Sequence, residues 1–205
     1  YSTNTFPSWD LAQPFRTLAH NGEINTLKGN INWMKIHEQD MSSSLFKNVK
    51  DLKPVIRSSS DSGALDNVFE LLVHSGKLAP LIKLMMIPDA WSKRSKTVPK
   101  NHQDLFNFLN STIEPWDGPA AICETDAKWV LASSDRNGLR PLRYTITSDD
   151  LFYAGSETGM IKIPEEKIIE KGKLGPGQII AIDLKKGKLF KDKEIKDLLA
   201  RDYKK

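Results

Sequence analysis

The stretch on which the fold prediction depends is Phe15-Arg16-Thr17-Leu18-Ala19-His20-Asn21-Gly22-Glu23-Ile24. Residues 15–19 form a short and mostly apolar segment, which is typical of a buried strand. Asn21-Gly22 is a strong turn signal, and apolar residues then recur at helical spacing as far as Glu38, with Thr26 as a candidate cap. We therefore expect a strand, a turn at residues 20–22 on the edge of a sheet, and a helix.

Outward from this stretch, helical patterns dominate the first half of the chain and strand patterns the second. The expected helices cover residues 65–76, 78–87 and 104–113, and a charged helix closes the chain at 193–201. The expected strands cover residues 120–123, 129–132, 142–147, 151–154, 168–170, 178–183 and 188–190. This order predicts an α+β protein with antiparallel sheets and argues against a βαβ repeat.

Composition limits the function classes. The chain has 205 residues, 39% hydrophobic and 27% charged, so one soluble globular domain can bury a core. No apolar run approaches the roughly 20 residues of a membrane helix. The net charge is +4, and many of the lysines lie in the last third of the chain. They alternate with acidic residues, which favours a solvated charged surface over a nucleic-acid-binding one. The single cysteine, Cys123, excludes an internal disulfide framework and fits a reducing compartment.

Two short motifs could carry chemistry. The side-chain amide of Asn21 and the backbone N–H of Gly22 could both stabilise the oxygen of a tetrahedral intermediate, and losing one such donor costs about 10²–10³ in rate. The same dipeptide is more often an ordinary type I′ hairpin turn. Asp61 follows three serines at an expected helix start, where a carboxylate usually caps the helix but could also pair with the α-ammonium of an amino-acid ligand.

Other polar residues favour structural interpretations. Cys123 lies in a predicted strand of small apolar residues, where a free thiol is commonly buried and inert. Alternation with Asn21 predicts that His20 packs away from the pocket. The polar run at 135–141 predicts a structured turn near that pocket, with Arg136 and Arg140 in buried ion pairs. The four histidines show no metal-ligand spacing: His20, His37, His74 and His102.

A series of motifs follows in fixed order along most of the chain. These stretches cover residues 2–9, 18–26, 29–30, 32–34, 60–62, 85–91, 114–121, 134–141 and 154–159. The first reads Ser-Thr-Asn-Thr-Phe-Pro-Ser-Trp and the second Leu-Ala-His-Asn-Gly-Glu-Ile-Asn-Thr. Together they resemble the class II glutamine amidotransferase domain of glutamate synthase over about residues 1 to 190, and the specificity of the resemblance comes from the collinear order of the pieces.

The resemblance implies an N-terminal-nucleophile hydrolase fold, in which two antiparallel sheets lie between helical layers (αββα). Residues 1–205 would be the C-terminal greater part of one such domain, incomplete at its N-terminus. In this family the N-terminal cysteine of the mature chain attacks the side-chain amide of glutamine, with its own α-amine as the base. Ammonia leaves, and the glutamyl thioester is hydrolysed.

Carried over by residue, the resemblance assigns Asn21 and Gly22 to the oxyanion hole. Asp61 matches the acid that holds the glutamine α-ammonium, and Thr3 matches a residue beside the glutamine carboxylate. The family's nucleophilic cysteine, and an arginine expected just before Tyr1, are not in the sequence. We therefore expect a fragment that hydrolyses no glutamine by itself.

The resemblance also implies partners. No cofactor is expected in this domain, whereas FMN and an iron–sulfur cluster are implied for the complete enzyme, which adds the ammonia to 2-oxoglutarate. Beyond glutamine, the expected partners are the remaining domains of the parent chain and either ferredoxin or a nicotinamide-dependent small subunit, with no nucleic acid and no membrane. The expected compartment is the cytoplasm or a plastid stroma. Two alternatives stay open, an amidotransferase of purine, amino-sugar or asparagine synthesis and a non-catalytic glutamine-binding module.

Overall fold

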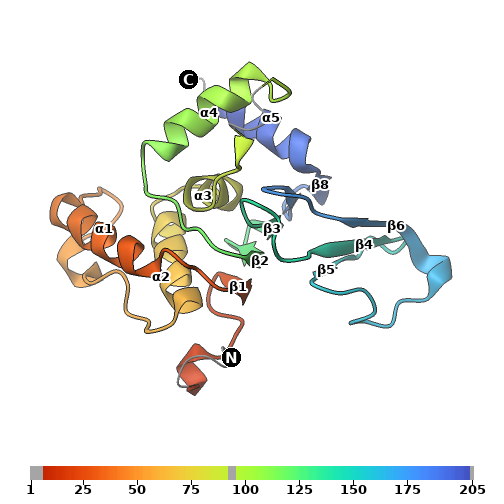
Figure 1. Cartoon of the computed structure of the whole chain (residues 1–205), viewed down its shortest axis with the longest axis horizontal. Coiled ribbons are helices and arrows are strands. Elements are labelled where there is room, and N and C mark those ends of the chain that lie inside the picture. The colour runs from red at the N-terminus through yellow and green to blue at the C-terminus, as the bar shows by residue number, and fades with distance from the viewer. Residues whose placement is uncertain (1–6, 92–95, 204–205) are drawn as a thin grey trace.

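The computed structural model, which describes residues 7–91 and 96–203, has two antiparallel sheets, and in Figure 1 the smaller one lies to the right of the larger. The larger sheet has the strand order β1-β2-β3-β7-β8, and the smaller has the order β5-β4-β6. The strands of the larger sheet are β1 (Leu18–Gly22), β2 (Ala120–Thr125), β3 (Trp129–Ser134), β7 (Ile179–Asp183) and β8 (Lys188–Phe190). Those of the smaller sheet are β4 (Arg143–Thr147), β5 (Phe152–Gly155) and β6 (Ile168–Lys173).

The α-helices come mainly from the first half of the chain. They are α1 (Leu27–Asp40), α2 (Asp61–His74), α3 (Ala79–Met86), α4 (Lys100–Asn110) and α5 (Asp192–Asp202). Helices α2, α3 and α5 pack on the larger sheet, and α4 packs on α3 and α5. Helix α3 is buried along its whole length because it lies between α2, α4 and β3 (Figure 1).

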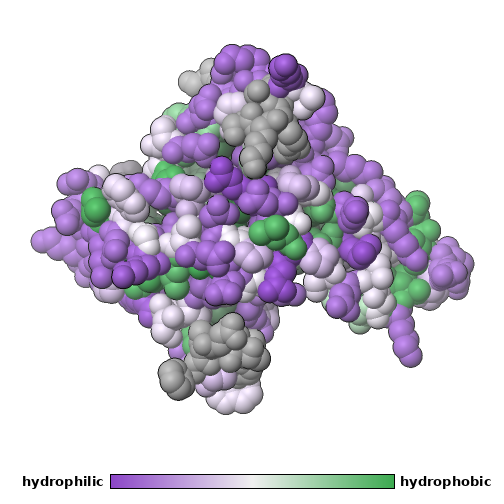
Figure 2. Space-filling model, viewed as in Figure 1, coloured by the Kyte–Doolittle hydropathy of each residue, from purple (hydrophilic) through white to green (hydrophobic). Residues whose placement is uncertain are grey.

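Alternation along the strands divides the core in two. Ile122 and Leu131 belong to the main core between the larger sheet and the helices, whereas Ala121 and Ala132 belong to a second cluster that includes Tyr144 of the smaller sheet. The surface in Figure 2 is mostly hydrophilic, with small separate hydrophobic patches. Among the described residues, no helix is long and apolar enough to cross a membrane.

The helices of the first half and the two antiparallel sheets confirm the predicted α+β class.

The predicted turn at residues 20–22 is wrong, and so is the hairpin alternative. Asn21 and Gly22 are the last residues of β1 and pair with β2, Gly22 lying opposite Ala120. The pairing continues beyond the strand. Glu23 donates its N–H to the carbonyl of Pro119 at 2.9 Å, and two residues later Asn25 donates to the carbonyl of residue 117 at 2.8 Å. A segment almost 100 residues away thus keeps this Asn-Gly pair extended.

Candidate active site

The outer edge of β1 carries a row of backbone N–H groups, because β1 is the edge strand of the larger sheet. Leu18 donates to Asp66 Oδ1 at 3.2 Å, and His20 donates to Gln13 Oε1 at 2.5 Å. Beyond the strand end, the N–H of Ile24 donates to a side chain at 2.8 Å. Hydrogen-bonding direction alternates along an antiparallel pair. The N–H of Gly22 therefore points to the same outer edge, between donors that side chains already occupy.

Only glycine fits at position 22. A Cβ there would lie 1.9 Å from the carbonyl oxygen of Pro119 and 2.8 Å from Nε2 of His20. The neighbouring Asn21 is exposed and lies opposite Ala121 in the strand pairing. Because strand side chains alternate between faces, Asn21 lies on the face toward the smaller sheet. Its amide and the outward N–H of Gly22 can both serve as donors at this strand end.

Asp61 lies beside this strand end. It is the first residue of α2, but the helix cap is Ser60, whose hydroxyl accepts the N–H of Gly63 at 3.0 Å. The local interpretation of Asp61 as the cap is therefore wrong. Its carboxylate instead accepts the N–H of Ile24 at 2.8 Å through Oδ2 and the hydroxyl of Ser62 at 3.4 Å through Oδ1. The structure thus places a half-buried carboxylate on the N–H of Ile24, which is two residues along the chain from Gly22.

His20 lies on the opposite face of β1 from Asn21, as strand alternation predicts, and is 6% exposed. Its Nδ1 is 2.8 Å from the hydroxyl oxygen of Ser62. Burial lowers the pKa of the imidazole, and the nearby carboxylate of Asp61 opposes this only in part. The ring is therefore neutral at pH 7.

The turn after β3 is organised by one carboxylate, that of Asp135, which is 1% exposed. The oxygens of Asp135 accept the backbone N–H groups of Ala120, Asn137, Leu139 and Arg140 at 2.9–3.1 Å. The structured turn was predicted, but its buried ion pairs were not found. Arg136 is 3.7 Å from Asp117 with both side chains more than one-third exposed, and Arg140 is exposed. Backbone donors take the place that the guanidinium groups were expected to fill.

Two further residues complete the set considered from the sequence. Burial raises the pKa of the Cys123 thiol to about 11, so the sulfur is protonated and a poor nucleophile. Thr3 lies outside the described residues. Within those residues, no group of His, Cys, Asp or Glu side chains could hold a metal ion.

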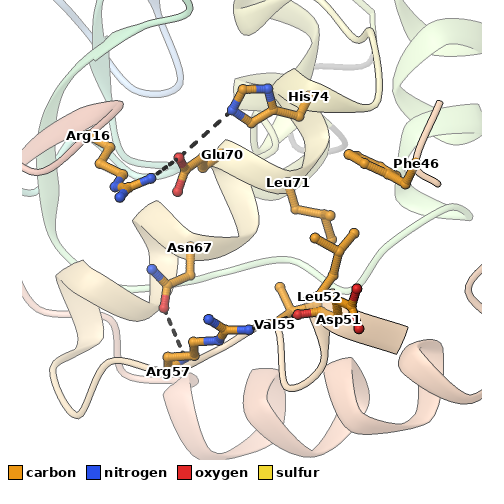
Figure 3. Close-up of a pocket in the computed structure, with 10 residues that line it drawn as sticks. All are labelled: Arg16, Phe46, Asp51, Leu52, Val55, Arg57, Asn67, Glu70, Leu71 and His74. Carbon is orange, nitrogen blue, oxygen red and sulfur yellow. Dashed lines mark hydrogen bonds and ion pairs between the residues drawn. The ribbon is translucent and has the colours of Figure 1, made fainter. Parts of the chain in front are cut away.

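A separate cavity of about 440 Å³ lies along the C-terminal half of α2, away from Asp61 (Figure 3). Its polar side chains pair with one another, because Glu70 contacts Arg16 at 3.0 Å and His74 at 3.8 Å. The backbone of Arg57 donates to Asn67 at 2.9 Å. Charged side chains in this cavity pair with one another, and none of the predicted site residues lines it. It is therefore not the candidate active site.

The fold has two antiparallel sheets and brings an amide, an outward backbone donor and a carboxylate to one strand end, and sequence comparison shows which class of protein the chain belongs to. The chain belongs to the class II glutamine amidotransferases, since the family model described as "Glutamine amidotransferases class-II" matches residues 1–205. The predicted family and its N-terminal-nucleophile fold are thereby confirmed.

Relatives with curated names are glutamate synthases. The chain is 60% identical over 202 residues to the glutamate synthase [NADPH] large chain of Azospirillum brasilense, covering 98% of this chain and 13% of the relative. It is 43% identical to the corresponding chain of Bacillus subtilis, covering 99% of this chain and 13% of the relative. It is 45% identical to ferredoxin-dependent glutamate synthase 2 of Synechocystis, with the same coverages of 99% and 13%. The chain thus spans about an eighth of the length of these relatives.

Among solved structures, the chain is similar to the glutamine phosphoribosylpyrophosphate amidotransferase of B. subtilis, with 19% identity and a TM-score of 0.45. That match covers 90% of this chain and 32% of the other.

Proposed function

We propose that this chain is the greater part of the glutamine-hydrolysing domain of a glutamate synthase, which releases ammonia from glutamine for transfer to 2-oxoglutarate. The observation that carries the proposal is the strand end of β1, where the Asp61 carboxylate accepts the N–H of Ile24, two residues after Gly22. Identities of 43–60% to glutamate synthases over almost the whole chain favour this acceptor over purine, amino-sugar or asparagine synthesis.

The proposed chemistry divides between this chain and residues upstream of Tyr1. The nucleophile, the N-terminal cysteine of this family, is not among the 205 residues. Its thiolate attacks the side-chain amide carbon of glutamine and forms a tetrahedral intermediate. The amide of Asn21 and the N–H of Gly22 stabilise the negative oxygen of that intermediate, then ammonia leaves and water hydrolyses the thioester to glutamate.

The other end of the substrate needs charge complementarity. Asp61 is half-buried and its oxygens retain acceptor capacity, so it can receive the α-ammonium of glutamine in charge-assisted hydrogen bonds. Thr3 is proposed to lie beside the α-carboxylate. Together these contacts would hold a free amino acid and reject a glutamine side chain within a protein, which has no free ammonium.

The rest of the parent enzyme follows from the same proposal. FMN and an iron–sulfur cluster would belong to its other domains, and either ferredoxin or a nicotinamide-dependent small subunit would deliver electrons. The named relatives include both donor types, so this domain is compatible with either. The proposed compartment is the cytoplasm, or a plastid as in the chloroplastic relative from Arabidopsis thaliana.

The test uses the full reading frame that contains this chain. Asn21→Ala should lower the rate of glutamine hydrolysis by about 10²–10³, because one oxyanion donor is lost. Asn107→Ala, on the exposed side of α4, is the matched control and should leave the rate unchanged. An unchanged rate in Asn21→Ala would remove that residue from the oxyanion role.

Residues 1–205 alone should release no ammonia from glutamine. Activity of this chain that disappears in Cys123→Ser would contradict the proposal, because the nucleophile would then be internal. A full-length protein that binds glutamine without hydrolysing it would instead support the non-catalytic alternative.

A further inference from the structure

The backbone of His20 is held from outside the sheet. Its N–H donates to Gln13 Oε1 at 2.5 Å, and its carbonyl accepts from Gln13 Nε2 at 2.8 Å. The primary amide of Gln13 thus makes the pair of hydrogen bonds that a neighbouring strand would make. Its neighbours Ala19 and Asn21 lie opposite Cys123 and Ala121 of β2, so the strand is held at both edges around His20.

One edge of that ring leads to Asp61. The hydroxyl of Ser62 donates to Asp61 Oδ1 at 3.4 Å and is 2.8 Å from Nδ1 of His20. The hydroxyl of Ser62 therefore lies between the imidazole and the carboxylate, and a chain of polar contacts runs from His20 through Ser62 to Asp61.

The other edge of the ring lies against Gly22. Nε2 of His20 is buried on this side, where the backbone of Pro119 also acts on the ring. It is 2.8 Å from the position that a Cβ on Gly22 would occupy, so the ring fills the space beside Gly22. One buried side chain therefore lies beside Gly22 and reaches the Asp61 carboxylate through a single hydroxyl.

We propose that His20 is a positioning residue, which sets the separation between the Gly22 donor and the Asp61 carboxylate. This inference rests on the proposed function. Glutamine is held at both ends during the reaction, so these two groups must lie at a separation that matches its length. A misplacement of about 1 Å can cost about 10²-fold in rate. His20 does not touch substrate in this scheme, and its effect passes through the two groups that do.

The decisive variants are His20→Leu, which keeps volume but removes both ring nitrogens, and Ser62→Ala, which breaks the link to Asp61. Measured in the full-length protein, each should lower kcat/KM for glutamine about 10-fold or more, with KM raised in both. Because both variants break one chain of contacts, the double variant should be no worse than the poorer single variant. His20→Asn should recover most of the activity lost in His20→Leu, since its side-chain amide can hydrogen-bond the Ser62 hydroxyl as Nδ1 does.

A matched control is His102→Leu. His102 is 4% exposed and its Nε2 is 2.7 Å from Asp197, so it is an equally buried histidine between α4 and α5. Its variant should lower Tm and leave the glutamine kinetics unchanged. Glutamate formation from added ammonium and 2-oxoglutarate, which bypasses this site, should be unaffected in the His20 and Ser62 variants and reports on the integrity of the rest of the enzyme.

Wild-type kcat and KM in folded His20→Leu and Ser62→Ala would overturn the inference, even with a lower Tm. If His20→Leu does not fold, Ser62→Ala decides, because that substitution breaks the same link. Failure of the proposed function would look different, since Asn21→Ala and Asp61→Asn would then also leave glutamine hydrolysis unchanged.

Discussion

Two aspartates near the end of β1 are used in different ways. Asp135 is 1% exposed, and both of its oxygens accept backbone N–H groups from two segments of the chain. Asp61 is half-buried and accepts one backbone N–H, from Ile24, with a long contact to a neighbouring hydroxyl. A carboxylate whose acceptor sites are filled by backbone stabilises a turn. One that keeps free acceptor capacity at the surface can bind a cation, so the difference separates scaffold from site.

The largest expected effect is at Asp135. In Asp135→Asn, an NH₂ group must face backbone N–H donors whichever way the amide turns, because both oxygens of Asp135 are acceptors. We expect the free energy of unfolding to fall by about 3 kcal/mol. Urea denaturation measures this, with Asp104→Asn on the exposed face of α4 as the control. A loss below about 1 kcal/mol would show that the turn does not depend on this carboxylate.

An intermediate effect is expected at Glu124, a third carboxylate, which is buried and accepts the hydroxyl of Ser133 at 3.0–3.1 Å. Burial raises its pKa to about 7, although Lys83 nearby opposes the shift. The folded state therefore keeps a proton that the unfolded state releases between pH 4.5 and 7, so stability should fall as pH rises through that window.

The variant Glu124→Gln should lose this pH dependence. The wild-type chain should lose on the order of 1–2 kcal/mol more than the variant between pH 5 and pH 7, measured as the free energy of unfolding. Lys83 acts in the opposite direction at higher pH: burial lowers its pKa to about 8, so stability should rise from about pH 8 toward 10. Parallel curves for wild type and Glu124→Gln would show that this carboxylate does not titrate as its burial implies.

The smallest effect on stability is expected at Asp61, where the kinetic effect should be clear. Asp61→Asn keeps an oxygen for the N–H of Ile24, so the free energy of unfolding should change by less than about 1 kcal/mol. The negative charge is lost, however, and KM for glutamine in the full-length protein should rise about 10- to 100-fold. An unchanged KM would mean that Asp61, like Asp135, serves only the scaffold.

The elements with strong periodic patterns were predictable from the sequence. The apolar segment 78–87 became α3 (Ala79–Met86), and the short strands of the second half were found close to their expected positions. The end of β1 was not predictable, because Asn21-Gly22 is a local turn signal that contacts with residues 117–120 override. Local patterns describe the conformational preference of a segment and do not contain its distant partners.

The site shows the same limit. Asn21, Gly22 and Asp61 came from the ordered motifs, whereas Asp61 by its own position looked like a helix cap. Ser62 and Gln13 were missed, because their contacts with His20 join residues 42 and 7 positions apart and follow no period. No pattern in the sequence separates Asp61 from its neighbour Ser60 as the cap, and only the bond from Ile24 to Asp61 shows which side chain turns toward the strand.

The two hydrogen bonds between the Gln13 side chain and the backbone of His20 also affect how the edge of β1 can pair with other molecules. An exposed edge strand invites pairing with an edge from another molecule, which is a common route to aggregation. Here Asp66 occupies the outward donor of Leu18, and Gln13 occupies both outward groups of His20. A foreign strand would therefore find its hydrogen-bonding positions already filled along most of β1, while a molecule as small as an amino acid could still reach the remaining donor at Gly22. The hydrogen bonds from Gln13 to His20 thus protect this strand edge from pairing with extended chains.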